Sequence, residues 1–155
     1  MSMSTLVRKG TPRDADAVAA LSYALWPGVP LEEHLSQTRE TLAERASSTM
    51  PLVIFVAEVD GAVIAFIEVG LRSHADGCDP RQPVGFVEGW FVAAPHRRSG
   101  VGAALLRAAE AWARERGCRE MASDTWIDAD VSQAAHEALG FEMVDRCVNY
   151  RKSLV

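Results

Sequence analysis

One short stretch of the sequence carries the residue types of an anion-binding loop. Residues 97–102 read RRSGVG, with two glycines one residue apart that follow two arginines and precede an alanine-rich run. A glycine-rich turn at the start of a helix exposes backbone N–H groups, and the helix dipole adds to their attraction for negative charge. The stretch therefore predicts a site that holds an anionic group.

Two common nucleotide-binding patterns do not describe this loop. The P-loop pattern G-x-x-x-x-G-K-[ST] is absent because no lysine or threonine follows Gly102. The dinucleotide pattern G-x-G-x-x-G fails because residues 103–105 supply no third glycine. What remains is R-x-x-G-x-G over residues 97–102.

Two carboxylates have unusual surroundings. Glu88 interrupts the apolar run VGFVEGWFV, and Asp124 ends a short predicted strand. A carboxylate among apolar residues is costly to bury unless it is paired or faces a cleft. Both groups are thus candidates for binding a cationic ligand, with structural pairing to Arg72, Arg107 or Arg119 as the alternative.

Composition bounds the classes of protein to consider. The 155 residues, 48% hydrophobic and 24% charged, predict one globular domain over residues 1–155. A net charge of −5 argues weakly against nucleic acid and for a cationic partner. The three cysteines and four histidines lack metal-ligand spacing, so neither a disulfide framework nor a metal site is expected. No segment resembles a signal peptide or membrane span, and a reduced, cytoplasmic protein without membrane association is expected.

Hydrophobic periodicity and turn residues predict the elements that position these groups. The expected order is a strand over 5–9, a helix from Thr11-Pro12 to about Trp26, a second helix over 31–47, two hairpin strands over 51–59 and 62–72, a strand over 84–94, a helix over 99–116, a short strand over 119–126, a helix over 128–140 and extended, β-like segments over 141–154. This order predicts a single α+β domain.

The strand, the R-x-x-G-x-G loop and the long helix resemble the acyl-CoA pyrophosphate loop of the GNAT N-acetyltransferase superfamily. The order of elements and ALGFE at 138–142 extend that resemblance over nearly the whole chain. Further stretches together resemble the aminoglycoside 6′-N-acetyltransferases, namely LWPG (25–28), DGCD (76–79), FVEGWFV (86–92), CREMASDT (118–125), HEALGFE (136–142) and YRK (150–152). The resemblance implies an α+β (α/β three-layer) fold, with a mixed, mostly antiparallel central sheet of six to seven strands flanked by about four helices.

The resemblance also implies an activity. Members of this family transfer an acetyl group from acetyl-CoA to the 6′-amino group of aminoglycoside antibiotics, by direct transfer in a ternary complex. The implied partners are acetyl-CoA and a polycationic amine, with no metal, nucleic acid or membrane. The subgroup tends to form homodimers, and the C-terminal segments are a plausible place for exchange between subunits.

The resemblance assigns residues to two sites. The implied acetyl-CoA-binding residues are Trp90, Phe91, Val92, Arg98, Ser99, Gly100, Val101, Gly102, Ala103 and Asp130. The implied substrate-binding residues are Trp26, His74, Glu88, Asp124 and Asp145. Asp130 replaces a family asparagine, and His74 replaces a tyrosine of a relative.

Three of these residues, Glu88, Asp124 and Val92, are implied to take part in catalysis. A backbone N–H near Val92 is implied to polarise the thioester carbonyl. A carboxylate beside an ammonium raises the pKa of the amine. We therefore expect Glu88 and Asp124 to hold and orient the substrate, with proton removal through ordered water.

Several alternatives remain open at the level of sequence. Trp26 could be a core tryptophan at a helix end, and Asp145 a surface charge. His136 stands where many superfamily members place a tyrosine general acid, and it could fill that role or simply pack against the sheet. The chain could also acetylate a polyamine or a peptide amine, or be a non-catalytic acyl-CoA-binding domain.

Overall fold

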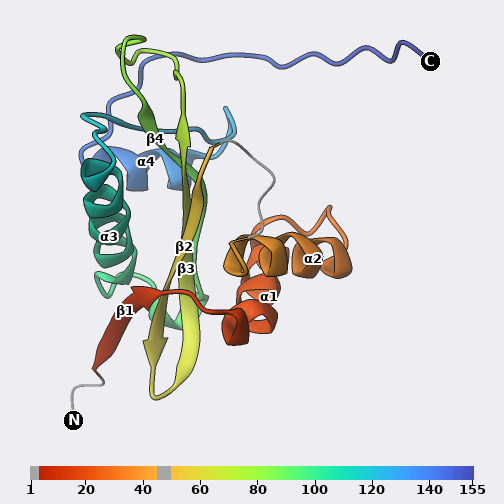
Figure 1. Cartoon of the computed structure of the whole chain (residues 1–155), viewed down its shortest axis with the longest axis vertical. Helices are drawn as coiled ribbons and strands as arrows, with labels where there is room; N and C mark the ends of the chain where they lie inside the picture. The colour runs from red at the N-terminus through yellow and green to blue at the C-terminus, as the bar shows by residue number, and fades with distance from the viewer. Residues whose placement is uncertain (1–3, 45–49) are drawn as a thin grey trace.

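One five-stranded sheet lies between two layers of helices in the computed structural model, which describes residues 4–44 and 50–155 (Figure 1). The strands follow the order β1 (Thr5–Lys9), β2 (Leu52–Val59), β3 (Ala62–Arg72), β4 (Val84–Val92) and β5 (Met121–Ser123). Neighbouring strands are antiparallel except β5, which runs parallel to β4. The sheet is therefore mixed and mostly antiparallel, as predicted.

Four α-helices cover the sheet. Helices α1 (Ala15–Leu25) and α2 (Leu31–Leu42) lie on one face, whereas α3 (Val101–Glu115) and α4 (Asp130–Ala138) lie on the other (Figure 1). Short 3₁₀ turns at Pro12–Asp14 and Ala94–His96 precede α1 and the loop before α3. The second predicted helix ends at Leu42, earlier than expected, and residues 45–47 of that prediction lie outside the described residues.

The prediction of six to seven strands is wrong for the single chain, in whose described residues five strands occur. Residues 141–155, predicted to be β-like, pair with no strand, and their C-terminal part runs extended away from the body of the molecule (Figure 1). Their sequence has the residues of strands, but strand pairing needs a neighbouring edge alongside. This C-terminal tail lies alongside no strand edge among the described residues of its own chain.

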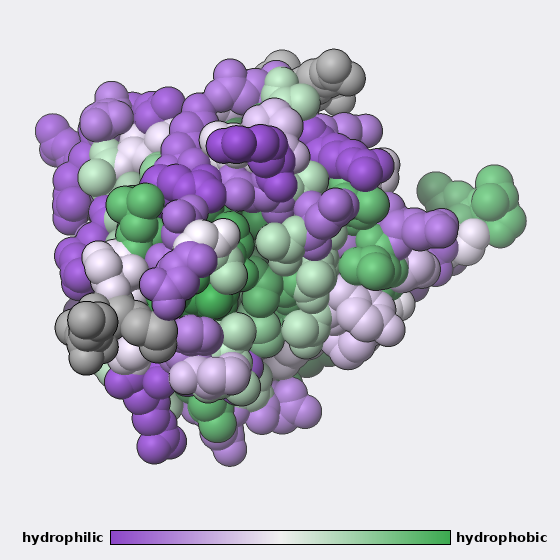
Figure 2. Space-filling view, turned by 90° about the horizontal axis from the view of Figure 1, so that it is seen from below, coloured by the Kyte–Doolittle hydropathy of each residue, from purple (hydrophilic) through white to green (hydrophobic). Residues whose placement is uncertain are grey.

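The tail exposes apolar side chains. Seen from below, it projects sideways and ends in an apolar tip, while apolar residues also gather at the centre of that face of the body (Figure 2). The exposed apolar residues of the tail are Met143, Val144, Val148, Tyr150, Leu154 and Val155. Such side chains gain free energy when another surface covers them.

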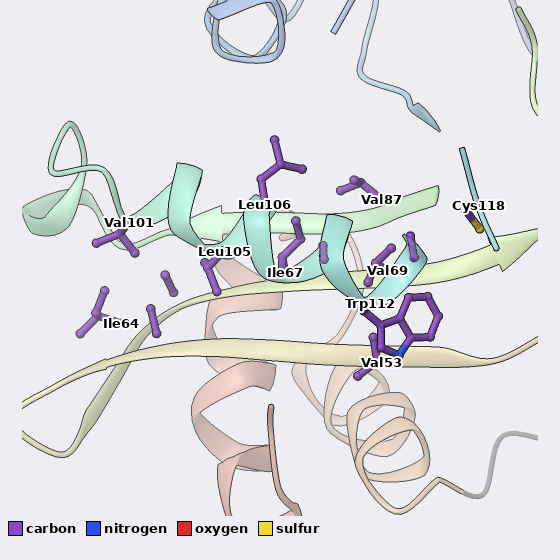
Figure 3. Packing of buried hydrophobic residues seen from close by; sticks show 14 of the residues in the cluster. Val53, Ile64, Ile67, Val69, Val87, Val101, Leu105, Leu106, Trp112 and Cys118 are labelled. Atoms are coloured by element: carbon purple, nitrogen blue, oxygen red, sulfur yellow. The ribbon is translucent and has the colours of Figure 1, made fainter. Parts of the chain in front are cut away.

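The larger core forms where α3 packs on the sheet. One stripe of the helix is buried, made of Val101, Leu105, Leu106, Ala109, Trp112 and Ala113. This spacing of three and four residues places them on one helix face. Leu105 and Ile67, the latter on β3, are both fully buried, and Figure 3 shows Leu105 pointing toward the strands. The packing fixes the start of α3, and with it the preceding glycine loop, relative to β4.

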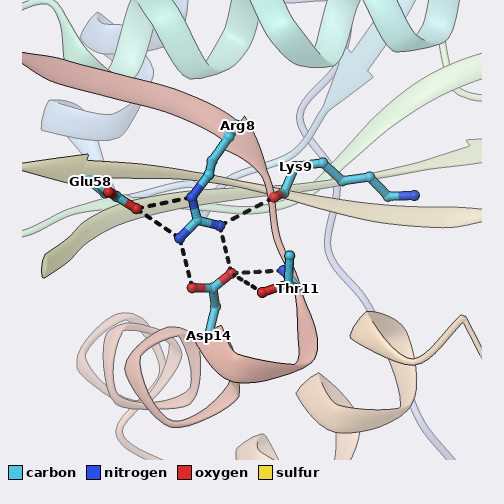
Figure 4. A network of polar contacts seen from close by, with 5 residues as sticks. All are labelled: Arg8, Lys9, Thr11, Asp14 and Glu58. Atoms are coloured by element: carbon cyan, nitrogen blue, oxygen red, sulfur yellow. Dashed lines mark hydrogen bonds and ion pairs between the residues drawn. The ribbon is translucent and has the colours of Figure 1, made fainter. Parts of the chain in front are cut away.

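A second core and a polar network hold α1 on the opposite face. Val18 of α1 packs with Val56 and Phe66 of the sheet. Arg8 on β1 donates hydrogen bonds of 2.8 and 2.9 Å to the Asp14 carboxylate and one of 3.0 Å to Glu58 on β2 (Figure 4). The hydrogen bonds from Arg8 lower the pKa of Asp14 from 3.8 to about 2. The start of α1 is thus tied to two strands.

Candidate active site

Two adjoining cavities open on the face of the sheet that carries α1 and α2. The first has a volume of about 480 Å³ and is lined by Met50, Leu52, Glu68, Leu71, Arg72, Ser73, His74 and Glu88. The second, of about 330 Å³, is lined by Ser22, Trp26, His34, Gln37, Thr38, Glu40, Thr41, Leu52, Phe66, Glu68 and Gly89. Because both share Leu52 and Glu68, they form one acidic cleft, and we call it the cleft below.

Trp26 forms a wall of this cleft. It follows the last residue of α1, and the Pro27 and Pro30 that come after it cannot continue the helix. Its ring stacks on His34 of α2, with centroids 6.3 Å apart, and 36% of the residue is exposed. A side chain at Gly89 would lie 2.7 Å from the Trp26 ring, so this glycine makes room for it on β4. Trp26 therefore lines a cavity instead of filling the core.

Glu88 projects into the cleft from a β-bulge. On β3, Glu68 pairs with Gly89 and the next residue, Val69, pairs with Val87, which leaves Glu88 as the extra residue on β4. Arg72 donates hydrogen bonds of 3.0 and 2.9 Å to the two oxygens of Glu88. The structure thus contains the ion pair between Glu88 and Arg72, which was one of the alternatives open from the sequence. Glu88 lines the cleft as well.

Glu68 is a cleft residue that the sequence interpretation missed. It lies in the middle of β3, is partly buried, and lines both cavities. Burial, followed by the nearby charge of Glu88, raises its pKa from 4.5 to about 7. The signal was available, because Glu68 interrupts the apolar run AVIAFIEVGL just as Glu88 interrupts its own.

The other predicted substrate residues have different positions. His74 lines the first cavity, where the Ser73 hydroxyl lies 3.0 Å from its Nδ1. Asp124 is exposed and directly follows β5. Because Ser123 pairs with Val87 and the two strands are parallel, Asp124 lies next to Glu88 along the strand direction. Asp145 lies on the exposed tail, where it accepts the backbone N–H of Arg146. The chain therefore brings Trp26, His74 and Glu88 into the cleft, but not Asp145.

The outer edge of β4 is open beside the cleft. Within the described residues, β5 pairs only with 85–87, which leaves residues 88–92 without a strand on that side. The Ala93 N–H donates a hydrogen bond to the Ile64 carbonyl on β3. Because successive residues of a strand alternate in direction, the N–H and the carbonyl of Val92 both point away from β3. The Val92 carbonyl accepts a 2.9 Å hydrogen bond from Arg97. The Val92 N–H therefore points to the open edge, where the sequence interpretation requires it.

The loop before α3 has the geometry of an anion cradle. Arg98 and Gly100 both have positive φ, of 59° and 82°, which turns the chain sharply into the helix. The Ser99 hydroxyl donates to the His96 carbonyl, and Arg98, Ser99 and Gly100 are all exposed. The first N–H groups of the 15-residue helix, which begins with the buried Val101 and the partly buried Gly102 and Ala103, have no partner one turn earlier. They can bind a phosphate group.

Trp90 connects this loop to the open edge of β4. Its Nε1 is buried and has no hydrogen-bond partner among the described residues. A Cβ atom placed on Gly102 would lie 3.6 Å from the Trp90 ring. The ring also meets the His136 ring edge-on, with the two ring centroids 5.6 Å apart. A buried donor without a partner is costly. The edge, the loop and this N–H together fit a ligand with phosphate groups and amide-like acceptors.

His136 packs against the sheet, which was one of its two alternatives. Its Nδ1 lies 2.7 Å from the Ser132 carbonyl and its Nε2 lies 2.8 Å from the Ser123 hydroxyl. The ring also contacts Phe141 at 5.2 Å. Of the remaining predicted donor-site residues, Phe91 faces the α1 side with Arg97 above its ring, and Asp130 is exposed at the start of α4.

Comparison with known proteins gives a consistent family. The profile described as Acetyltransferase (GNAT) family matches residues 17–141. The chain is 40% identical to Aminoglycoside N(6′)-acetyltransferase type 1 of Stenotrophomonas maltophilia, over 96% of this chain and 93% of that protein. It is also 40% identical to the protein of the same name from Klebsiella aerogenes, over 99% of this chain and all of that protein. A solved structure of AAC(6′)-Iy with the bisubstrate analogue CoA-S-monomethyl-acetylneamine superposes with a TM-score of 0.86 at 38% identity, covering 97% of this chain and 99% of that one.

Proposed function

Because the chain belongs to the Acetyltransferase (GNAT) family, we propose that it is an aminoglycoside 6′-N-acetyltransferase. It transfers the acetyl group of acetyl-CoA to the 6′-amino group of aminoglycoside antibiotics. One observation carries the assignment. An acidic cleft walled by Trp26 and an anion-binding loop meet at the same strand, β4, from opposite faces of the sheet.

The donor side is formed by the loop and the open strand edge. The predicted residues 98–103 hold the pyrophosphate of acetyl-CoA mainly through backbone N–H groups, and residues 90–92 of β4 run beside its pantetheine arm. The indole N–H of Trp90, which has no hydrogen-bond partner among the described residues, and the outward backbone N–H of Val92 lie along this path. Acetyl-CoA supplies an activated thioester, and the Val92 N–H polarises its carbonyl.

The acceptor side carries negative charge for a cationic substrate. Glu88 in the cleft and Asp124 at the end of β5 hold and orient the ammonium groups of the aminoglycoside, while Trp26 and His74 line its path. Holding both reactants on one strand converts their encounter into a reaction within a ternary complex. Asp130 and Asp145 stay predictions, as contacts to acetyl-CoA and to the substrate.

A thiol-release assay tests the assignment. The purified chain is supplied with acetyl-CoA and with kanamycin, tobramycin, spermidine or a short peptide, and free CoA is followed with time. Aminoglycosides are expected to give the highest kcat/KM. Dominant turnover of spermidine or peptide would instead assign the chain to polyamine or peptide acetylation, and CoA binding without any turnover would assign it to a non-catalytic domain.

The same assay then tests the acceptor residues. Glu88→Ala and Asp124→Ala are each expected to lower kcat/KM for tobramycin by at least about tenfold, as the loss of a charged hydrogen bond predicts. Glu115→Ala is the control, because Glu115 is 76% exposed on α3, away from the cleft. Wild-type kinetics in both the Glu88 and the Asp124 variant would show that these carboxylates do not bind the substrate.

We also infer that the protein is a homodimer that exchanges its C-terminal tails. The root of the tail is held in place, since Val144 packs on Gly77 and Arg146 donates a 3.1 Å hydrogen bond to the Ile127 carbonyl. Beyond that point the tail pairs with no described strand and exposes apolar side chains. An extended arm of this kind is complementary to a strand edge of a second copy.

We also propose that the protein is located in the cytoplasm. The cysteines Cys78, Cys118 and Cys147 are all unpaired, as expected in a reducing compartment. In the described part of the chain, no helix has the length and apolarity to cross a membrane. No cluster of three or more His, Cys, Asp or Glu side chains there could hold a metal ion.

A further inference from the structure

We propose that Glu68 is a substrate-binding residue, whose carboxylate forms the floor of the cleft and contacts an amino group of the aminoglycoside. The proposal rests on the proposed function and adds a residue to its acceptor site. It assigns to Glu68 the binding of an ammonium group and leaves the chemical step to the groups on β4.

The position of Glu68 makes it reachable from the whole cleft. It lies on the face of β3 that carries Phe66, and it lines the cavity beside Arg72 as well as the one beside Trp26. Its partner across the strand pair is Gly89, over which the Trp26 ring lies, so Glu68 stands next to the wall of the second cavity. A cationic group that enters either cavity therefore meets the Glu68 carboxylate.

The charge of Glu68 is uncompensated, in contrast to that of Glu88. Arg72 donates two hydrogen bonds to Glu88 and so neutralises much of its charge. Within the described residues, the Glu68 carboxylate has no ion pair and no hydrogen bond. A buried carboxylate without a partner is costly, and a bound ammonium would remove that cost. The geometry therefore gives Glu68 more to gain from an ammonium group than Glu88.

Protonation of Glu68 couples this contact to pH. Several charged or titratable groups face it, namely Glu88 and Arg72 from the sheet, His34 and Glu40 from α2, and His74 after β3. Its pKa is raised to about 7, chiefly by burial. A bound ammonium favours the ionised carboxylate. Below pH 7 a proton has to leave before the ammonium binds, so substrate affinity falls.

Calorimetry provides the test. The Kd of tobramycin is measured in the presence of CoA, which carries no acetyl group and permits no turnover. Glu68→Gln keeps the shape of the side chain and is expected to weaken the Kd about tenfold at pH 8, in line with a charged hydrogen bond. The ratio of the two Kd values is expected to shrink at pH 6, where wild-type Glu68 is largely protonated. In steady-state assays the KM for tobramycin should rise while kcat changes less than the KM.

Matched variants keep the result interpretable. Glu115→Gln removes a carboxylate outside the cleft and should leave the Kd unchanged. The other charged groups of the cleft are the same in wild type and variant, so the comparison of the two at each pH isolates Glu68. If Glu68→Gln does not fold, Glu68→Asp withdraws the charge by one methylene and is expected to weaken the Kd about threefold.

Two negative results have different meanings. Tobramycin binding of equal strength in wild type and in the Glu68 variants would overturn this inference alone. A fall in kcat with unchanged Kd would also overturn it, since Glu68 would then act in the chemical step. A wild-type protein that binds CoA but no aminoglycoside would contradict the proposed function itself, and the role of Glu68 with it.

Discussion

Asp14 shows how a single carboxylate stabilises the side of the molecule that carries the cleft. It is 7% exposed, accepts hydrogen bonds from Arg8 and from the Thr11 N–H, and lies at the start of α1, whose other end carries Trp26. Its pKa falls from 3.8 to about 2 because the folded state favours the ionised form. The stabilisation is therefore fully present above pH 3.8 and is lost as the pH falls through 2.

Asp14→Asn is expected to lower the free energy of unfolding at pH 7 by about 2 kcal/mol, the value that a shift of this size implies. The measurement is urea denaturation of wild type and variant at equal protein concentration, at pH 7, 4 and 2.5. The difference between the two should shrink toward pH 2.5. Asp16→Asn is the control, because Asp16 is 87% exposed and 3.9 Å from Arg39, and it should change stability by less than about 0.5 kcal/mol. A difference that stays constant with pH would contradict the assignment.

At the residue scale, the sequence signal for a cleft residue is a charge that breaks an apolar pattern. Glu88 interrupts an apolar strand and lines the cleft, and Glu68 gives the same signal on β3; the role of Glu88 in binding stays a prediction. The choice of Arg72 as the partner of Glu88, among three candidate arginines, depended on strand register and on the bulge. Sequence spacing alone does not contain that information.

Helix α3 is the element that joins the core to the donor loop, and glycines stand at both of its ends. Gly100 precedes the helix with φ of 82°, and Gly117 follows it with φ of 83°. A side chain at either position would meet no atom within 4 Å. The only cost of a substitution is therefore the left-handed backbone, about 1 kcal/mol.

Gly100→Ala and Gly117→Ala should thus lower stability by similar amounts and differ in function. Only Gly100 belongs to the loop predicted to hold the pyrophosphate, so only its variant should weaken the Kd of acetyl-CoA, by about tenfold or more if the turn is distorted. Thermal unfolding and calorimetry on the same samples measure both quantities. Equal loss of acetyl-CoA affinity in the two variants would mean that the effect comes from α3 as a whole and not from the loop.

Elements with strong local signals were predicted well. The Asp60-Gly61 turn sets the β2–β3 hairpin, and the buried stripe of α3 follows its apolar periodicity. The segment over 141–154 was predicted to be β-like but forms no strand in the single chain. Its composition carries strand propensity, whereas pairing also requires the segment to lie alongside an edge, and it pairs with no described strand of this chain.

At the scale of the whole molecule, the C-terminal tail is the one described segment that packs on little of its own chain. The C-terminal tail is fixed at its root by Val144 and Arg146, and beyond them it makes no sheet contacts. In the proposed dimer the tail residues beyond Arg146 pair with a strand edge of the second copy, and the apolar side chains of the tail are covered there. Stability of the body and association of the copies are then linked through the tail.

Deletion of residues 148–155 is expected to convert a dimer into a monomer, and light scattering after gel filtration measures the mass directly. Val148→Asp with Tyr150→Asp is a full-length version of the same test, since two charges disfavour burial of the tail. Ser153→Ala is the matched control and should stay dimeric. A full-length protein that is monomeric at micromolar concentration would contradict the exchange of tails.

The short length of β5 has a consequence for how the sequence of such a protein can evolve. By pairing with only three residues of β4, β5 leaves residues 88–92 open for the proposed donor path, while the cleft lies on the face that carries α1 and α2. Substitutions in α1, α2 or β3 can then reshape the cleft without altering the loop before α3. Selection by a new antibiotic can act on one face of the sheet while the other is inherited unchanged.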